Sequence, residues 1–151
     1  MFRKFSHFLT LQTSLLHSNR VVHGFIARNM NSISSKIIST HSTEYADVHL
    51  VPMFLDNYGF ILVDKQTNTT ACIDPGDGSI IKSALDELKL KLNYIFCTHK
   101  HYDHVGGILE LKQDFPTVSV IGTKYEEVPG LDRGVGEGDI FQFGSLSVTV
   151  S

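Results

Sequence analysis

Three histidines and one aspartate fall within the six residues His99-Lys100-His101-Tyr102-Asp103-His104. This stretch directly follows an apolar run of the kind that forms a buried strand. In extended backbone, side chains two residues apart leave the same face, so His99 and His101 could chelate one ion. Asp103 and His104 come where the chain is expected to turn back toward the strand end, and there they could bind a second ion. The spacing therefore predicts a site for two metal ions.

The side chains of this stretch indicate which metals would bind. Imidazole and carboxylate groups suit zinc or iron, and two such ions about 3.5–4 Å apart can share one hydroxide. Gly106 and Gly107 follow at once, and we expect them to let the helix start approach the metal-binding loop closely. His49 is interpreted as an exposed strand residue rather than a ligand. Lys100 and Tyr102 would either touch substrate or pack against the protein.

Hydrophobic periodicity and turn signals predict the elements that must position this site. The expected strands are Ala46–Pro52, Tyr58–Val63, Thr70–Asp74, Leu92–Thr98, Val118–Gly122, Ile140–Phe143 and Leu146–Val150. The expected helices are Ser79–Leu90, with Ser79 as its N-cap, and Asp103–Phe115. Strands and helices alternate only in the middle of this order, with hairpins toward both ends. The predicted fold class is therefore mixed α/β.

Residues 1–43 differ in composition from the rest of the chain. They contain five Lys or Arg and no Asp or Glu, and they are rich in Ser, Thr, Asn and Leu. This composition is typical of a mitochondrial transit peptide, so we expect a removable or disordered leader and an ordered domain that begins near Tyr45. The protein is expected in the mitochondrial matrix, or in the cytoplasm where the leader is absent. Apolar runs are too short for a secretory signal or a membrane span.

Residues 44–151 are acidic. They hold eight Lys or Arg against sixteen Asp or Glu, a net charge of −8. An acidic body gives no support to nucleic-acid binding, which requires a basic surface. The two cysteines, Cys72 and Cys97, each lie in an apolar, strand-like run and are expected to be buried free thiols.

The ten residues Thr98–Gly107, THKHYDHVGG, resemble the T-H-x-H-x-D-H-x-G-G signature of the metallo-β-lactamase fold superfamily. Leu55–Phe60 and Ile73–Gly76 resemble the glyoxalase II branch, the hydroxyacylglutathione hydrolases. This resemblance implies an α/β fold, the N-terminal half of a metallo-β-lactamase-type αβ/βα sandwich, with a mixed sheet and helices on one face. Residues 44–151 would form this domain, incomplete at its C-terminus.

The resemblance also implies roles for the residues of the site. His99 and His101 match ligands of a first metal, and Asp103 and His104 match ligands of a second. Asp103 is the candidate catalytic residue, and Asp74 would support the metal loop through hydrogen bonds. Two Zn2+ ions per complete domain are implied, with iron or manganese as alternatives. The implied reaction is hydrolysis of the glutathione thioester S-D-lactoylglutathione to D-lactate and glutathione, by attack of a metal-bridging hydroxide.

Two alternatives stay open from the sequence. One is another enzyme on the same scaffold, such as a lactonase, a sulfur dioxygenase or a nuclease, the last disfavoured by the acidic body. The other is a truncated, non-catalytic isoform that acts as an interaction module. In the family pattern a third histidine, a bridging aspartate and a final histidine would lie beyond Ser151. A catalytic zinc normally has three protein ligands, so we expect the chain alone to bind metal weakly and to be inactive.

Half of a sandwich fold would leave one face of its sheet bare. The runs Tyr58–Val63 and Leu92–Thr98 are apolar on both faces, as in strands that are buried on both sides. Two helices can cover one face, so the other face is expected to expose a large apolar patch. The isolated chain is therefore expected to be insoluble or to associate.

Overall fold

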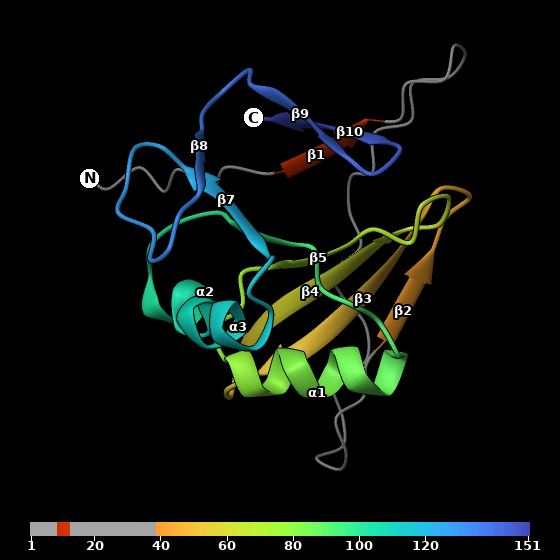
Figure 1. Cartoon of the computed structure of the whole chain (residues 1–151), viewed down its shortest axis with the longest axis horizontal. Helices are drawn as coiled ribbons and strands as arrows, with labels where there is room; N and C mark the ends of the chain where they lie inside the picture. Colours follow the sequence, from red (N-terminus) through yellow and green to blue (C-terminus); the bar gives the residue numbers. More distant parts are fainter. Residues whose placement is uncertain (1–8, 13–38) are drawn as a thin grey trace.

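The computed structural model describes residues 9–12 and 39–151. In these residues the chain forms two sheets and three helices (Figure 1). The strands are β1 Leu9–Gln12, β2 Ser39–Ser42, β3 Ala46–Met53, β4 Asn57–Asp64, β5 Thr70–Ile73, β6 Tyr94–Cys97, β7 Ser119–Thr123, β8 Arg133–Val135, β9 Ile140–Phe143 and β10 Leu146–Val150. The helices are α1 Gly78–Leu88, α2 Tyr102–Val105 and α3 Ile108–Asp114. Among the described residues, no helix has both the length and the apolar character needed to cross a membrane.

The larger sheet has the strand order β2-β3-β4-β5-β6-β7-β8. Neighbouring strands from β2 to β5 are antiparallel, because short turns connect them. From β5 to β8 they are parallel, because helical crossovers lead from β5 to β6 and from β6 to β7. The mixed α/β prediction is confirmed. The short edge strand β8 was not predicted.

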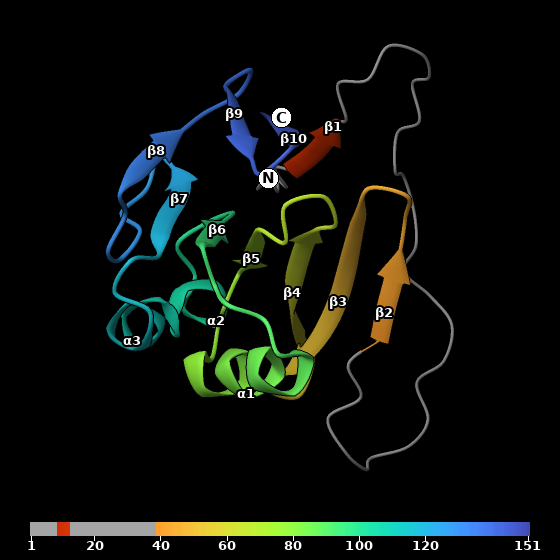
Figure 2. The same cartoon turned by 45° about the vertical axis from the view of Figure 1, so that its right-hand side comes forward.

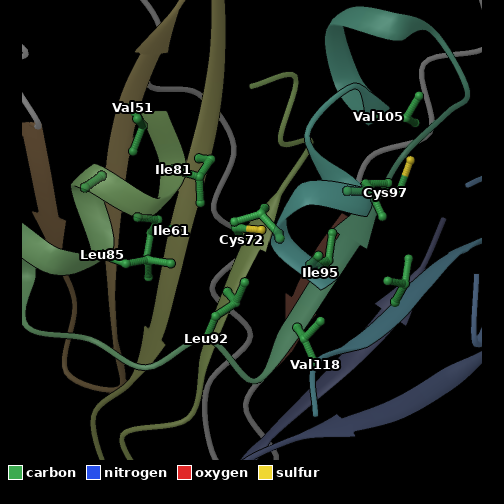
Figure 3. Close-up of a cluster of buried hydrophobic side chains, with 14 of the residues drawn as sticks. Val51, Ile61, Cys72, Ile81, Leu85, Leu92, Ile95, Cys97, Val105 and Val118 are labelled. Atoms are coloured by element: carbon green, nitrogen blue, oxygen red, sulfur yellow. The ribbon is translucent and has the colours of Figure 1, made fainter. Parts of the chain in front are cut away.

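The helices cover one face of this sheet. Ile81 and Leu85 of α1 are fully buried against Val51 and Ile61 of the sheet (Figure 3). The prediction that Ser79 caps this helix is wrong. The cap is Asp77, whose carboxylate accepts a hydrogen bond of 3.0 Å from the backbone N–H of Ile80.

A second, three-stranded sheet of order β1-β10-β9 covers the opposite face. Figure 2 shows the resulting layers, with α1 and α3 below the larger sheet and β1, β9 and β10 above it. The adjacent residues Ile61 and Leu62 of β4 belong to the two different cores, so this strand is buried on both sides. Phe141 and Phe143 of β9 meet Phe96 of β6 edge to face, at centroid distances of 5.4 and 5.6 Å. The expectation of a bare apolar face is therefore wrong for the described residues.

The single helix expected over Asp103–Phe115 is also wrong, because it is divided into α2 and α3 at Gly106 and Gly107. The backbone N–H of Gly107 donates a 2.8 Å hydrogen bond to the carbonyl of Pro75 in the β5–α1 loop. A Cβ on Gly107 would collide with the backbone nitrogen of Gly78, and one on Gly76 would collide with the carbonyl oxygen of Asp103. The β5–α1 loop and the segment around α2 thus interlock through glycine backbone. We expected Gly106 and Gly107 to allow a close approach to the metal-binding loop, and the structure shows that they approach the β5–α1 loop.

The described strands extend into the range expected to be a leader. β2 pairs antiparallel with β3, so the sheet begins at Ser39 rather than near Tyr45. β1 pairs antiparallel with β10. The rest of the range 1–43 lies outside the described residues, and its role as a mitochondrial address stays a prediction.

Phe143→Ala tests whether the second sheet closes the core. Phe143 is fully buried, and its ring packs against Tyr94 and Phe96. We expect the free energy of unfolding, measured by urea denaturation, to fall by about 3–5 kcal/mol. Ile140→Ala on the same strand is the control, because Ile140 is 61% exposed and its loss should cost less than about 1 kcal/mol. Equal effects of the two variants would contradict the layer arrangement.

Gly76→Ala tests the interlock of the two loops. Because its new Cβ meets backbone that cannot rotate away, we expect a loss of about 3 kcal/mol in the free energy of unfolding. In Gly78→Ala the new Cβ meets chiefly the flexible side chain of Glu110, so this control should stay within about 1 kcal/mol of the wild type. Thermal or urea unfolding of both variants measures the difference. A Gly76→Ala protein as stable as the wild type would rule out the close approach of Gly76 to the Asp103 backbone.

Candidate metal centre

The candidate site lies where β6 ends. Residues 98–101 form the metal loop, which leads from Cys97 into α2. The strands β5 and β7 lie parallel to β6 on either side. The rings of His99 and His101 have centroids 4.7 Å apart, and those of His99 and His104 are 4.0 Å apart. The structure therefore brings the three histidines of the motif together at one strand end.

Asp74 lies at the centre of this arrangement. It directly follows β5 in a left-handed backbone conformation, with φ of 52°, and the residue is 8% exposed. Its carboxylate accepts hydrogen bonds from the backbone N–H of Thr98 at 2.8 Å and from the Thr98 hydroxyl at 2.7 Å. Its Oδ2 also lies 3.2 Å from Nδ1 of His104. Asp74 thus contacts both ends of the motif.

Asp103 is the most exposed of the candidate acids, and Asn57 holds it in place. Asp103 Oδ2 lies 3.3 Å from Nε2 of His104. The Asn57 amide donates to the Asp103 carbonyl at 2.6 Å and to its carboxylate at 3.3 Å. The Asn57 oxygen accepts from the backbone N–H of Tyr58, which fixes the orientation of the amide. Asn57 drew attention in the sequence only as part of a motif, because nothing in the spacing places it beside a residue 46 positions away.

Glu126, in the loop between β7 and β8, is a second residue that the sequence pattern did not indicate. Its carboxylate accepts a 2.9 Å hydrogen bond from the backbone N–H of Lys100, the residue between the two leading histidines. Glu126 stands next to another acid, Glu127, in a stretch without periodicity. Nothing in the sequence indicates that Glu126, and not Glu127, contacts the loop.

The electrostatic surroundings of the three histidines differ. Burial lowers the pKa of His99, and the neighbouring His104 lowers it further. The neutral imidazole, the form that binds metals, is thereby favoured at His99. The Asp74 carboxylate raises the pKa of His104, with Asp103 adding to the effect.

The residues present fit a bound cation. Nδ1 of His104 is buried against the Asp74 carboxylate, 3.2 Å away, and Nε2 of the same ring faces Asp103. Three imidazoles and a carboxylate are also the donors that divalent transition metals take. Within residues 39–151, however, no three such donors are already arranged as a complete metal-binding group. The donors are gathered, and metal binding itself stays a prediction.

Neither cysteine is a candidate ligand, although the Cys97 thiol donates a 3.1 Å hydrogen bond to the His99 carbonyl. Both are buried free thiols, as predicted. Burial raises the pKa of Cys97 to about 12 and that of Cys72 still higher, so neither is a thiolate at neutral pH.

The remaining residues considered from the sequence lie elsewhere or point outward. The expectation that His49 is exposed is wrong: it is 8% exposed, and its Nδ1 lies 2.7 Å from the Thr40 hydroxyl, on β3 away from the motif. Tyr102 is 75% exposed, and Lys100 is exposed as well. Neither packs into the core.

Curated relatives match part of this chain. A hydroxyacylglutathione hydrolase from Photobacterium profundum is 40% identical over 92 residues, which make up 61% of this chain and 36% of that protein. One from Brucella anthropi is 46% identical over 97 residues, 63% of this chain and 37% of that protein. The matched segment thus spans little more than a third of the length of these relatives.

Solved structures and a family model agree on the fold. The B3 metallo-beta-lactamase BLEG-1 superimposes with a TM-score of 0.58 at 15% identity, covering 68% of this chain and 59% of that one. A metallo-beta-lactamase from Staphylococcus aureus superimposes with a TM-score of 0.56 at 18% identity. The superposition covers 70% of this chain and 33% of that one. The model of the metallo-beta-lactamase superfamily matches residues 58–144, more than half of the 151 residues. The chain therefore belongs to the metallo-beta-lactamase superfamily.

Proposed function

We propose that this chain supplies the metal-binding residues of a thioester hydrolase of glyoxalase II type, which cleaves S-D-lactoylglutathione to D-lactate and glutathione. The observation that carries this proposal is the convergence of His99, His101 and His104 with Asp74 at the end of β6. The identity of 40–46% to hydroxyacylglutathione hydrolases over 92–97 residues of the chain supports the substrate class.

Membership of the superfamily implies a divalent metal, typically zinc. His99 and His101 would hold one ion, and Asp103 and His104 a second, with iron or manganese as alternatives to zinc. When bound, such ions polarise a carbonyl oxygen and lower the pKa of water. This is the chemistry that a thioester, with its electrophilic carbonyl, requires.

The residues of the chain itself hold the donors in position. Thr98 ties the start of the loop to Asp74, so the backbone that carries His99 cannot swing away from β5. Asp74 also faces Nδ1 of His104, which leaves Nε2 directed toward Asp103. Asn57 restrains the Asp103 carboxylate. Carboxylates that face the second nitrogen of a ligating histidine commonly fix its tautomer and ring orientation.

A segment exchange tests the proposed function. Residues 58–144 replace the matching segment of the Brucella anthropi hydroxyacylglutathione hydrolase, and hydrolysis of S-D-lactoylglutathione is measured. We expect the chimera to hydrolyse the thioester, because residues 58–144 carry the four proposed donors His99, His101, Asp103 and His104. His99→Ala and Asp103→Ala in the chimera should each lower kcat/KM by at least about 100-fold, since each removes a metal ligand.

The matched control in the chimera is Asp86→Ala, which removes an exposed carboxylate on α1, away from the metal loop. It should retain the activity of the parent chimera. A folded chimera that binds zinc but leaves the thioester intact would contradict the substrate class. Activity that survives both ligand substitutions would contradict the assignment of the site.

A further inference from the structure

We propose that Glu126 is a positioning residue of the metal centre, whose carboxylate holds the backbone between His99 and His101. The inference rests on the proposed function, because it takes these histidines to be metal ligands. Glu126 lies 26 residues after Lys100 in the sequence, on a different loop, and reaches the metal loop from the side of β7 and β8.

The metal loop is held by side-chain carboxylates on both sides. From the β5 side, Asp74 accepts the backbone N–H of Thr98 at 2.8 Å. From the β7–β8 side, Glu126 accepts the backbone N–H of Lys100 at 2.9 Å. The bond from His104 N to His101 O, 2.9 Å long, then leads into α2. Glu126 thus anchors the middle of the loop, between β6 and α2.

The position of Lys100 determines what this anchor does. The N–H that Glu126 accepts belongs to the peptide between His99 and Lys100, one residue before His101, so rotating this peptide would turn one ring relative to the other. The ring centroids lie 4.7 Å apart. The acceptor is a charged carboxylate, which makes a stronger hydrogen bond than a neutral acceptor and so favours one orientation of this peptide. Glu126 would therefore order the two donors before a cation arrives.

Charge adds to this effect. Glu126 and Asp74 each place a carboxylate against the backbone of the metal loop. Together with Asp103 in the motif, these acids surround the histidines with negative charge. A divalent cation would be attracted to this side of the loop.

The test uses the full chain, with zinc affinity measured by competition with a chromophoric chelator. Glu126→Ala and Glu126→Asp should weaken binding, the first by about 10–100-fold, because alanine has no acceptor and the aspartate carboxylate is one methylene too short to reach the Lys100 N–H. Glu126→Gln keeps a carbonyl oxygen at the same length and should stay within about 3-fold of the wild type. Glu127→Ala removes the same charge from the neighbouring exposed residue and should bind as the wild type does.

A second readout separates positioning from general stability. Cobalt(II) added in place of zinc should give visible absorption bands that shift in Glu126→Ala and Glu126→Asp, and that return in Glu126→Gln. The thermal unfolding of the metal-free proteins should be alike. If Glu126→Ala does not fold, the comparison of Glu126→Asp with Glu126→Gln decides, because one keeps the charge and the other keeps the length.

The outcomes distinguish this inference from the proposed function. Wild-type zinc affinity and an unchanged cobalt spectrum in Glu126→Ala, or in Glu126→Asp if Glu126→Ala does not fold, would overturn the role of Glu126 and leave the metal centre standing. Binding as weak in Glu126→Gln as in Glu126→Ala would also overturn it, because the hydrogen bond would then be irrelevant. A wild-type chain without zinc affinity would overturn the metal centre and this inference together.

Discussion

Two hydrogen bonds from Thr98 to the buried carboxylate of Asp74 tie the end of β5 to the start of the metal loop. A buried carboxylate is costly unless its charge is compensated, and here the Thr98 groups and the His104 ring surround it. The same contacts that stabilise Asp74 therefore determine where the loop begins and how His104 is oriented. The other contacts of the site act on a loop that is already anchored at this point.

The scaffold makes that anchor possible. Parallel pairing of β5, β6 and β7 brings their carboxyl ends to one edge, and the interlock at Gly76 and Gly107 presses the β5–α1 loop against the start of α2 and α3. Apolar layers on both faces of the sheet hold these strands in register. A polar loop with a gathered set of donors can then stand at the edge of a rigid core, as a binding site requires.

Local features of the site followed from the sequence, because they depend on short spacing. The strand before the motif and the grouping of His99, His101 and His104 both arise within the short segment Leu92–His104. The contributions of Asn57 and Glu126 could not be predicted, because each acts across more than twenty residues through a hydrogen bond to backbone. The second face of the sheet was predicted to be bare for a related reason. The sequence pattern of the β9–β10 hairpin does not indicate which face of the sheet the hairpin packs against.

The central claim is that the histidines at the end of β6 bind the metal. X-ray absorption at the zinc edge of the zinc-loaded chain tests it most directly, because imidazole and thiolate ligands differ in distance. The account predicts nitrogen or oxygen neighbours at about 2.0–2.1 Å with the outer-shell scattering of imidazole, and a weaker imidazole contribution in His99→Ala, which keeps His101 and His104. A sulfur shell near about 2.3 Å would contradict it, because the metal would then be bound by Cys72 or Cys97.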